Sequence, residues 1–184
     1  MTRTVYYTAT SLDGFIADRE NSLSWLLSRE SDQEGPMGFS TFEKGLGAIV
    51  MGSTTYRWVQ DNGGPDPWSY TQPAWVLTHR DLTPFPGADI RFTAADTREE
   101  LVALHAEMVA AAGELDVWVV GGGPVAAQLA EAGLLDEVVV AIAPVTLGGG
   151  APLLPARVEL ATREVAQNGE FACVRYAVVR PDAD

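Results

Sequence analysis

The chain has little cysteine, little basic charge and no long apolar stretch. Cys173 is the single cysteine among 184 residues, which excludes a disulfide within the chain; with only two histidines, a zinc site is also disfavoured. We therefore predict no metal and a reducing, cytoplasmic location. No segment approaches the roughly 18 consecutive apolar residues of a membrane helix, and the N-terminus lacks a signal-peptide pattern, so we expect no membrane association.

Basic residues are also few relative to acidic ones. The 12 Lys and Arg against 25 Asp and Glu leave a formal net charge of -13, and the acids are spread along the chain. Nucleic acid needs a basic face that this composition does not easily provide, so no such partner is expected. An anionic cofactor can still bind where helix N-termini and a few arginines outweigh the long-range repulsion.

The remaining composition is typical of one globular domain spanning residues 1–184. The chain is 47% hydrophobic and long enough for one well-buried core. It contains no internal repeat, and its two segments richest in turn-forming residues, 61–68 and 83–89, are short enough to be loops.

Short apolar runs predict strands that alternate with helices. A poorly periodic stretch over residues 21–38 is read as either a long loop or a weak helix. Strands are expected over residues 4–10, 47–51, 74–78, 90–93, 117–120 and 138–142.

Capping signals place the helices. Ser40 to Glu43 and Thr97 to Glu100 both have the spacing of a capping box, and Gly113 is expected to end the second of these helices. The polar trio at residues 53–55 offers N-cap oxygens for a helix through about residue 59, and Pro124 suits the first turn of a helix that ends near residue 133.

The order of these elements predicts the fold class. The run VVVAI at residues 138–142 is apolar without alternation, as expected for a strand covered on both faces of a parallel sheet. Asn168-Gly169 lies between two strand-like runs and predicts an antiparallel hairpin. We expect a three-layer α/β fold with a mostly parallel central sheet and an antiparallel C-terminal hairpin.

Two glycine turns, at Gly52 and at residues 121–123, lead from a buried strand into a helix. Such turns expose backbone N–H groups and the positive end of a helix dipole to a phosphate. A glycine at this junction also has a plainer explanation, because it eases the turn itself. The GxGxxG spacing of a Rossmann site and the lysine of a P-loop are both absent.

Five blocks in order give a resemblance to a known family. The blocks are SLDGFIAD, AIVMGSTTY, WVLTHR, VWVVGGGPVAAQL and LLDEVVVAIAPVTLGGGAPLLP. Together they cover nearly the whole chain and resemble the dihydrofolate-reductase-like family, in the branch of the RibD C-terminal domain of riboflavin biosynthesis. The resemblance implies a reductase that passes a hydride from NADPH to a small substrate.

The resemblance also implies where the cofactor binds. Its phosphates are expected at the first glycine turn, where Ser53 replaces the usual arginine and Arg57 lies nearby. A cis peptide is expected at Gly121-Gly122. The implied cofactor residues are Ala9, Gly52, Ser53, Thr54, Thr55, Thr78, His79, Arg80, Gly121, Gly122, Gly123, Pro124 and Val125.

Within this set, the resemblance implies that Arg80 gives the preference for NADPH over NADH. In the family, a hydroxyl residue and a basic residue bind the adenosine ribose and its 2′-phosphate, and Thr78 and Arg80 match these two residues. The alternative for Arg80 is a solvated loop arginine.

The proton donor is less clearly marked. The resemblance places Asp13 of SLDG beside the substrate, although an aspartate before glycine is also a common turn former. Folate reductases carry a carboxylate a few residues after a tryptophan, and the spacing from Trp25 implies Glu30 or Asp32. Both lie in the charged run RESDQE, which is otherwise a solvated surface. Asp13 and Glu30 are our catalytic candidates.

Other aromatic and histidine residues allow two readings. The side chains of Trp25, Tyr56, Trp58 and Trp68 either roof an aromatic substrate or belong to the core. His105 falls on the helix after Thr97 and is expected at the surface.

The activity itself is also open. The expected substrate is a small heterocycle or a ribosylamino-pyrimidine, as for 5-amino-6-(5-phosphoribosylamino)uracil reductase. The absence of a preceding deaminase domain favours a stand-alone reductase with a different substrate. The alternatives are an NADP-binding protein without catalysis and, third, a dihydrofolate reductase. The apolar run after residue 137 and the strand-rich C-terminus indicate a homodimer, as in relatives that dimerise, or belong to the core alone.

Overall fold

One eight-stranded sheet organises the computed structural model of the chain, which describes residues 1–63 and 68–180. The first six strands across the sheet are parallel to one another, and the last two are antiparallel: β10 runs antiparallel to β7, and β9 runs antiparallel to β10. Across the sheet the order is β5 (Ile90–Thr93), β4 (Ala74–Leu77), β3 (Leu46–Gly52), β6 (Asp116–Gly121), β1 (Thr4–Ser11), β7 (Glu137–Ala143), β10 (Phe171–Val178) and β9 (Leu160–Asn168).

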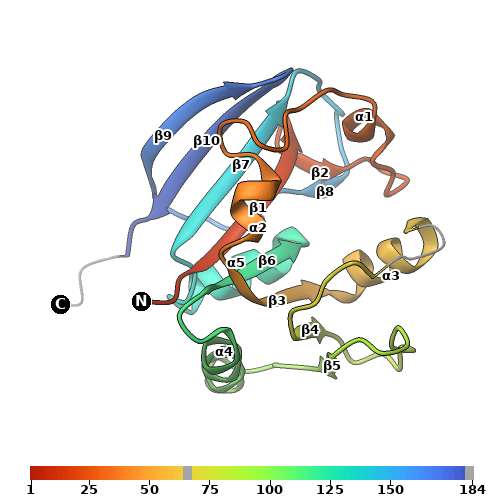
Figure 1. Cartoon of the computed structure of the whole chain (residues 1–184), viewed down its shortest axis with the longest axis vertical. Coiled ribbons are helices and arrows are strands. Elements are labelled where there is room, and N and C mark those ends of the chain that lie inside the picture. Colours follow the sequence, from red (N-terminus) through yellow and green to blue (C-terminus); the bar gives the residue numbers. More distant parts are fainter. Residues whose placement is uncertain (64–67, 181–184) are drawn as a thin grey trace.

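Helices cover both faces of this sheet (Figure 1). The helices are α1 (Ser24–Leu27), α2 (Phe39–Glu43), α3 (Ser53–Asn62), α4 (Arg98–Ala112) and α5 (Gly123–Glu131). Residues of α4 and α5 pack with Tyr6 on one face, and residues of α2 and α3 pack with Trp118 on the other. The predicted three-layer, dihydrofolate-reductase-like fold class is confirmed. A second sheet pairs β2 (Phe15–Ala17) with β8 (Ala151–Pro152).

The long helix α4 forms where its sequence predicts it. The Thr97 side chain accepts a hydrogen bond from the Glu100 N–H, and the Glu100 side chain accepts one from the Thr97 N–H, which completes the capping box. Leu101, Leu104 and Met108 are buried against the sheet, and Gly113 ends the helix with φ 65°. Local signals and core packing agree here.

The predicted capping box at Ser40 is wrong. Helix α2 begins at Phe39 after Gly38, and no side chain caps it. The aromatic residues of this short helix explain the difference: Phe42 stacks on Tyr7 with ring centroids 4.3 Å apart, and Phe39 packs on Trp118 at 5.2 Å. Packing onto the sheet sets this helix. The preceding poorly periodic stretch is mostly loop, with the single turn α1 inside it.

Two further helix predictions need correction. Helix α3 starts directly after Gly52, so residues 53–55 form its first turn and none of them supplies a side-chain cap; it also continues to Asn62, past the predicted end. His105 is half-buried rather than at the surface, because its ring Nε2 lies 2.7 Å from the Thr4 Oγ1 at the start of β1.

The C-terminal hairpin is confirmed. Asn168 pairs with Phe171, and Gly169 makes the turn with φ 56°. β7 is covered on both faces as predicted, but it lies at the border where the parallel strands meet the antiparallel pair. In residues 1–63 and 68–180 no helix has the length and apolar character needed to cross a membrane. Part of the predicted loop at 61–68 lies outside the described residues.

Candidate functional site

The three segments expected to hold a cofactor meet at one edge of the sheet. β3 lies between β4 and β6, with Gly52 opposite Leu77 and Met51 opposite Gly121. Because these strands are parallel, the residues that follow them emerge at the same edge. Ligands of open α/β sheets bind at such carboxyl edges.

The two glycine turns touch each other at this edge. A Cβ built on Gly121 would lie 3.0 Å from the Thr55 Oγ1, and one built on Gly52 would lie 3.4 Å from a methyl of Val125. Neither α3 nor α5 has a side-chain cap, so no capping side chain accepts a hydrogen bond from the first backbone N–H groups of these helices. The Gly121-Gly122 peptide bond is cis, as expected.

The glycines at the end of β6 and the start of α5 have different roles. A Cβ on Gly123 would collide with the carbonyl oxygens of Pro152 and Leu153, so this glycine lets α5 approach β8. A Cβ on Gly122 would meet only the Cδ of Pro124, at 3.5 Å. Only Gly122 therefore leaves open space beside the turn.

The segment after β4 carries the arginine expected to select NADPH. The Thr78 Oγ1 accepts a hydrogen bond from the Arg80 N–H at 2.9 Å, which shapes the turn. Both Arg80 and His79 are exposed, and the His79 Nε2 lies 2.8 Å from the Asp96 Oδ1. His79 is thus already paired, whereas the Arg80 side chain extends into solvent from the site edge.

These residues suit an anionic dinucleotide. Two uncapped helix N-termini, the turn at Gly122 and the exposed arginines Arg57 and Arg80 supply donors for phosphates. Ser53 adds a hydroxyl in place of the arginine expected there. The site thus offers mainly backbone donors and little positive charge.

A cavity of about 130 Å³ opens beside this edge, on the face of the sheet that carries α2. Its floor is made by β1, β7 and β10, and residues 31–39 cover it. Ala9 of β1 lines the cavity, and β1 lies next to β6, the strand that leads into the second glycine turn. The cavity is therefore on the side of the sheet where this turn emerges. The lining residues are Tyr7, Thr8, Ala9, Leu26, Ser31, Asp32, Gln33, Met37, Gly38, Phe39, Ala141, Asn168, Phe171 and Cys173.

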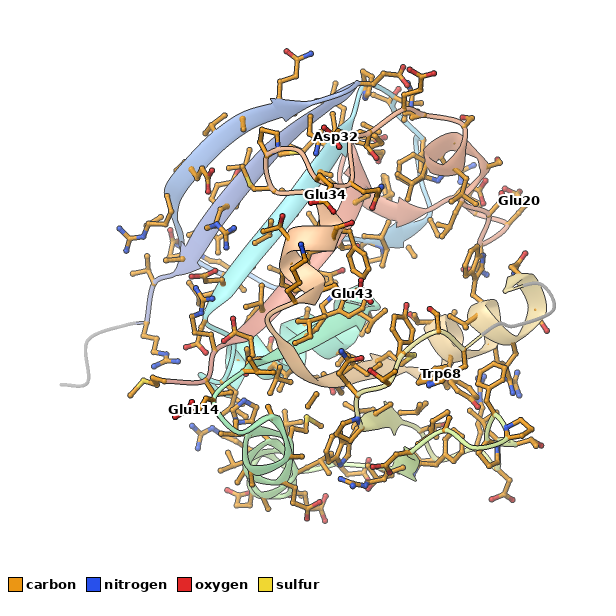
Figure 2. The ribbon with its side chains drawn as sticks, in the orientation of Figure 1. Glu20, Asp32, Glu34, Glu43, Trp68 and Glu114 are labelled. Atoms are coloured by element: carbon orange, nitrogen blue, oxygen red, sulfur yellow. The ribbon has the colours of Figure 1, made fainter. Side chains whose placement is uncertain are left out.

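Of the two carboxylates implied by the spacing from Trp25, Asp32 lines the cavity and Glu30 does not. Glu30 is exposed, and its backbone is held by the tip of the C-terminal hairpin: its N–H donates to the Glu170 Oε2 at 3.0 Å, and its carbonyl accepts from the Glu170 N–H at 3.1 Å. The Asp32 Oδ1 accepts the Glu34 N–H at 2.9 Å. Figure 2 shows Asp32 and Glu34 on the segment in front of the sheet.

Asp13 is fixed in a turn outside the cavity lining. Its carboxylate accepts hydrogen bonds from the Ser11 hydroxyl at 2.6 Å, from the Leu147 N–H at 3.0 Å and from the Gly148 N–H at 2.7 Å. These bonds lower the pKa of Asp13 to about 2, the Ser11 hydroxyl contributing most. Asp13 therefore stays ionised near neutral pH and links the turn after β1 to the loop after β7.

The aromatic residues divide between core and cavity. Tyr56 is buried, donates its hydroxyl proton to the Thr83 carbonyl at 2.8 Å and packs on Trp68, so these two belong to the core rather than to a roof over substrate. Trp58 is half-buried on α3, and Trp25 packs beside Phe171 at the cavity end of the sheet.

Three residues of the cavity lining were not predicted from the sequence as site residues: Tyr7, Asn168 and Cys173. Burial raises the pKa of Tyr7 to about 12, so its hydroxyl stays protonated and donates to the Met37 carbonyl at 2.8 Å. The available signal was the strand period of two, since Tyr7 and Ala9 share one face of β1. No local signal marked Asn168 or Cys173, which come from the far end of the chain.

Across the described part of the chain, no three His, Cys, Asp or Glu side chains gather closely enough to hold a metal ion.

Comparisons with known proteins agree with this geometry. The chain is 28% identical over 177 residues to the uncharacterized protein YwjB of Bacillus subtilis, covering 95% of this chain and 97% of that protein. The crystal structure of a putative riboflavin biosynthesis protein from Shewanella sp. PV-4 superposes with a TM-score of 0.78 at 26% identity and covers 97% of this chain and 99% of that one.

A dihydrofolate reductase shares the fold. The enzyme from Enterococcus faecalis, complexed with NADP(H) and RAB-propyl, superposes with a TM-score of 0.57 at 17% identity, with 96% of each chain covered. The sequence profile of the RibD C-terminal domain matches residues 4–172, which include both glycine turns and most of the cavity lining. The protein therefore belongs to the RibD C-terminal domain family, whose reductase-like fold is related to that of the riboflavin-pathway reductases.

Proposed function

We propose that this protein is an NADPH-dependent reductase that transfers a hydride to a small heterocyclic substrate. The observation that supports it best is that the two glycine turns meet at one edge of the sheet and that the cavity lined by Ala9 lies on β1, the strand next to β6. Hydride transfer needs little from the protein beyond holding the two reacting rings together.

The residues take distinct roles in this proposal. The free N–H groups at the starts of α3 and α5 bind the cofactor diphosphate, and Thr78 and Arg80 bind the adenosine 2′-phosphate. The small side chain of Ala9 leaves room for a ring between sheet and substrate. The reduced nicotinamide supplies the hydride when bound.

Asp32, rather than Glu30 or Asp13, is the carboxylate that faces the substrate in this proposal. Asp32 lines the cavity, whereas Glu30 lies outside the lining and Asp13 stays ionised and occupied by three donors. Asp13 acts as a positioning residue for the loop after β7. Asp32 orients the substrate ring by accepting hydrogen bonds from its N–H groups.

Nucleotide titration tests the cofactor site. NADPH and NADH are added to the protein separately, and binding is followed by nicotinamide fluorescence. We expect Arg80→Ala to weaken NADPH binding by about tenfold or more while changing NADH binding little, because a charge-assisted hydrogen bond contributes about 1.5–3 kcal/mol.

Arg163→Ala is the matched control for this titration. Arg163 is exposed on β9, at the opposite edge of the sheet from β4, and its removal changes net charge equally. The proposal fails if the unaltered protein binds neither nucleotide, or if Arg80→Ala and Arg163→Ala weaken NADPH binding to the same extent.

A binding protein without catalysis is the second candidate. Ser53 in place of an arginine and Asp13, which is ionised near neutral pH, favour it. Tight NADPH binding without oxidation of the nucleotide by any heterocycle would support this alternative over the reductase. A homodimer and a cytoplasmic location remain predictions.

A further inference from the structure

The proposed substrate cavity contains no cationic side chain. Among the described residues that line it, Asp32 is the one charged group. Enzymes that bind phosphate esters commonly place an arginine or lysine against the phosphate. The charge of this cavity is therefore unusual for a phosphorylated substrate.

All 12 Lys and Arg of the chain lie in the described residues, because neither residues 64–67 nor 181–184 contain one. On the cavity face, Arg175 follows Cys173 by two residues on β10, and it pairs with Glu137 at 3.0 Å and Glu164 at 3.3 Å. Arg29 precedes the covering segment and pairs with Glu170 at 3.2 Å. Both positive charges are compensated by carboxylates.

The surroundings of the cavity are acidic. Glu34 follows Asp32 on the covering segment, and Glu43 ends α2 on the same side of the sheet (Figure 2). Lys44, next to Glu43, is largely exposed and lies 3.9 Å from the Glu34 carboxylate. With a net charge of -13, the field at this face disfavours an approaching anion.

Two polar side chains that line the cavity, Asn168 and Tyr7, already donate their hydrogen bonds within the protein. The Asn168 amide donates both its protons, to the carbonyls of Asp32 at 2.8 Å and Pro36 at 3.0 Å. The Tyr7 hydroxyl donates to the Met37 carbonyl. The Asp32 carboxylate offers acceptors, so a ring that donates hydrogen bonds is complementary to the cavity.

The cavity is also small. A cavity of about 150 Å³ holds one benzene molecule, and this one measures about 130 Å³. One ring fits inside, so a ribose phosphate attached to that ring would extend to the mouth of the cavity, beside the acidic residues.

We propose that the cavity binds an uncharged or cationic ring that donates hydrogen bonds, and that the substrate of this protein carries no phosphate. This inference rests on the proposed reductase function for the identity of the cavity as the substrate site. It separates this protein from an enzyme that reduces a phosphoribosylamino-pyrimidine.

Cys173 reports the charge selectivity of the cavity without any knowledge of the substrate. It lines the cavity and is the single cysteine of the chain. The protein is treated with three methanethiosulfonates, carrying an ethylammonium, a propyl or an ethylsulfonate group, at mildly alkaline pH because burial raises the pKa of this thiol. Each rate constant is divided by that for mercaptoethanol.

We expect the anionic reagent to be disfavoured by at least about fivefold relative to the cationic one, since the screening length at physiological ionic strength is about 8 Å and Asp32 shares the cavity. Equal normalised rates, or a faster anion, would overturn the proposal. If no reagent modifies Cys173, the cavity does not reach that thiol and the proposal also fails.

A charge-insertion variant sharpens this test. Gln33→Lys adds a cation to the cavity lining, and we expect it to bring the anionic rate toward the neutral one. Gln128→Lys is the matched control, because Gln128 is exposed on α5 on the other face of the sheet. A uniform effect of both variants would show that only the net charge matters.

Substrate pairs complete the experiment. 5-Amino-6-ribosylaminouracil and its 5′-phosphate are compared as oxidants of NADPH and as protectants of Cys173. Preference for the phosphorylated member in either assay would overturn the proposal. NADPH binding by fluorescence is measured separately, so the loss of cofactor binding, which defeats the reductase function, is distinguishable from an error in the substrate class.

Discussion

Asn168 and Asp32 are joined by a reciprocal pair of hydrogen bonds across a separation of 136 residues. The Asp32 N–H donates to the Asn168 Oδ1 at 2.7 Å, and the Asn168 Nδ2 donates to the Asp32 carbonyl at 2.8 Å. Asn168 is buried, so this side chain replaces water as the partner of the loop backbone. The end of β9 thereby sets the position of a carboxylate in the cavity.

Asn168→Ala should lower the free energy of unfolding by about 1–3 kcal/mol, because it leaves backbone groups of the covering segment without their partners. Urea denaturation measures the change. Thr162→Ala, at an exposed position of the same strand, is the control and should have little effect. A loss in Asn168→Ala no larger than in the control would contradict the role assigned to this side chain.

Asp13 should contribute stability that depends on pH at the acid end. Its folded-state pKa of about 2 lies below the ordinary value of 3.8, so the contribution is complete above pH 3.8 and is lost as the pH falls toward 2. Asp13→Asn should therefore flatten the pH dependence of the unfolding free energy in this window. Parallel curves for the two proteins would show that the Ser11, Leu147 and Gly148 contacts do not hold the ionised form.

His105 should also make the free energy of unfolding fall as the pH is lowered, but at a higher pH than Asp13. Burial lowers its pKa below the ordinary 6.5. The charge of Asp136 opposes this shift with a smaller raising effect, and the charge of Arg180 adds to it. Its neutral form is favoured in the folded protein, so stability is complete above pH 6.5 and falls as the pH drops below it. The difference in unfolding free energy between the protein and His105→Gln should shrink from pH 7.5 to pH 5.5, and a constant difference would refute the assignment.

Gly123→Ala should destabilise the fold by roughly 1–3 kcal/mol or more, because its methyl would collide with the carbonyl oxygens of Pro152 and Leu153. Gly45→Ala is the control: its Cβ would meet the Phe42 carbonyl oxygen at an ordinary 3.5 Å. Thermal unfolding in the absence of nucleotide separates this packing role from cofactor binding. Equal melting temperatures of Gly123→Ala and Gly45→Ala would show that Gly123 has no packing role and would leave it with a role in cofactor binding alone.

Local signals predicted those parts of the fold that residues close in sequence decide. The Thr97 capping box and the Asn168-Gly169 hairpin each depend on hydrogen bonds within a few residues, and both formed as expected. The capping box at Ser40 failed because α2 is placed by Phe39 and Phe42 packing on the sheet. A local pattern did not contain that information.

The sequence by itself determined the alternation of strands and helices, the two glycine turns and the family, because these follow from short-range patterns and ordered blocks. Only the tertiary structure decided that β3 lies between β4 and β6, which brings the turns together. It also placed Asp32, and not Glu30, in the cavity lining, where hydrogen bonds to Asn168 at the far end of the chain hold the backbone of Asp32. A loop without periodicity carries no local record of which of its carboxylates a distant strand will hold against a cavity.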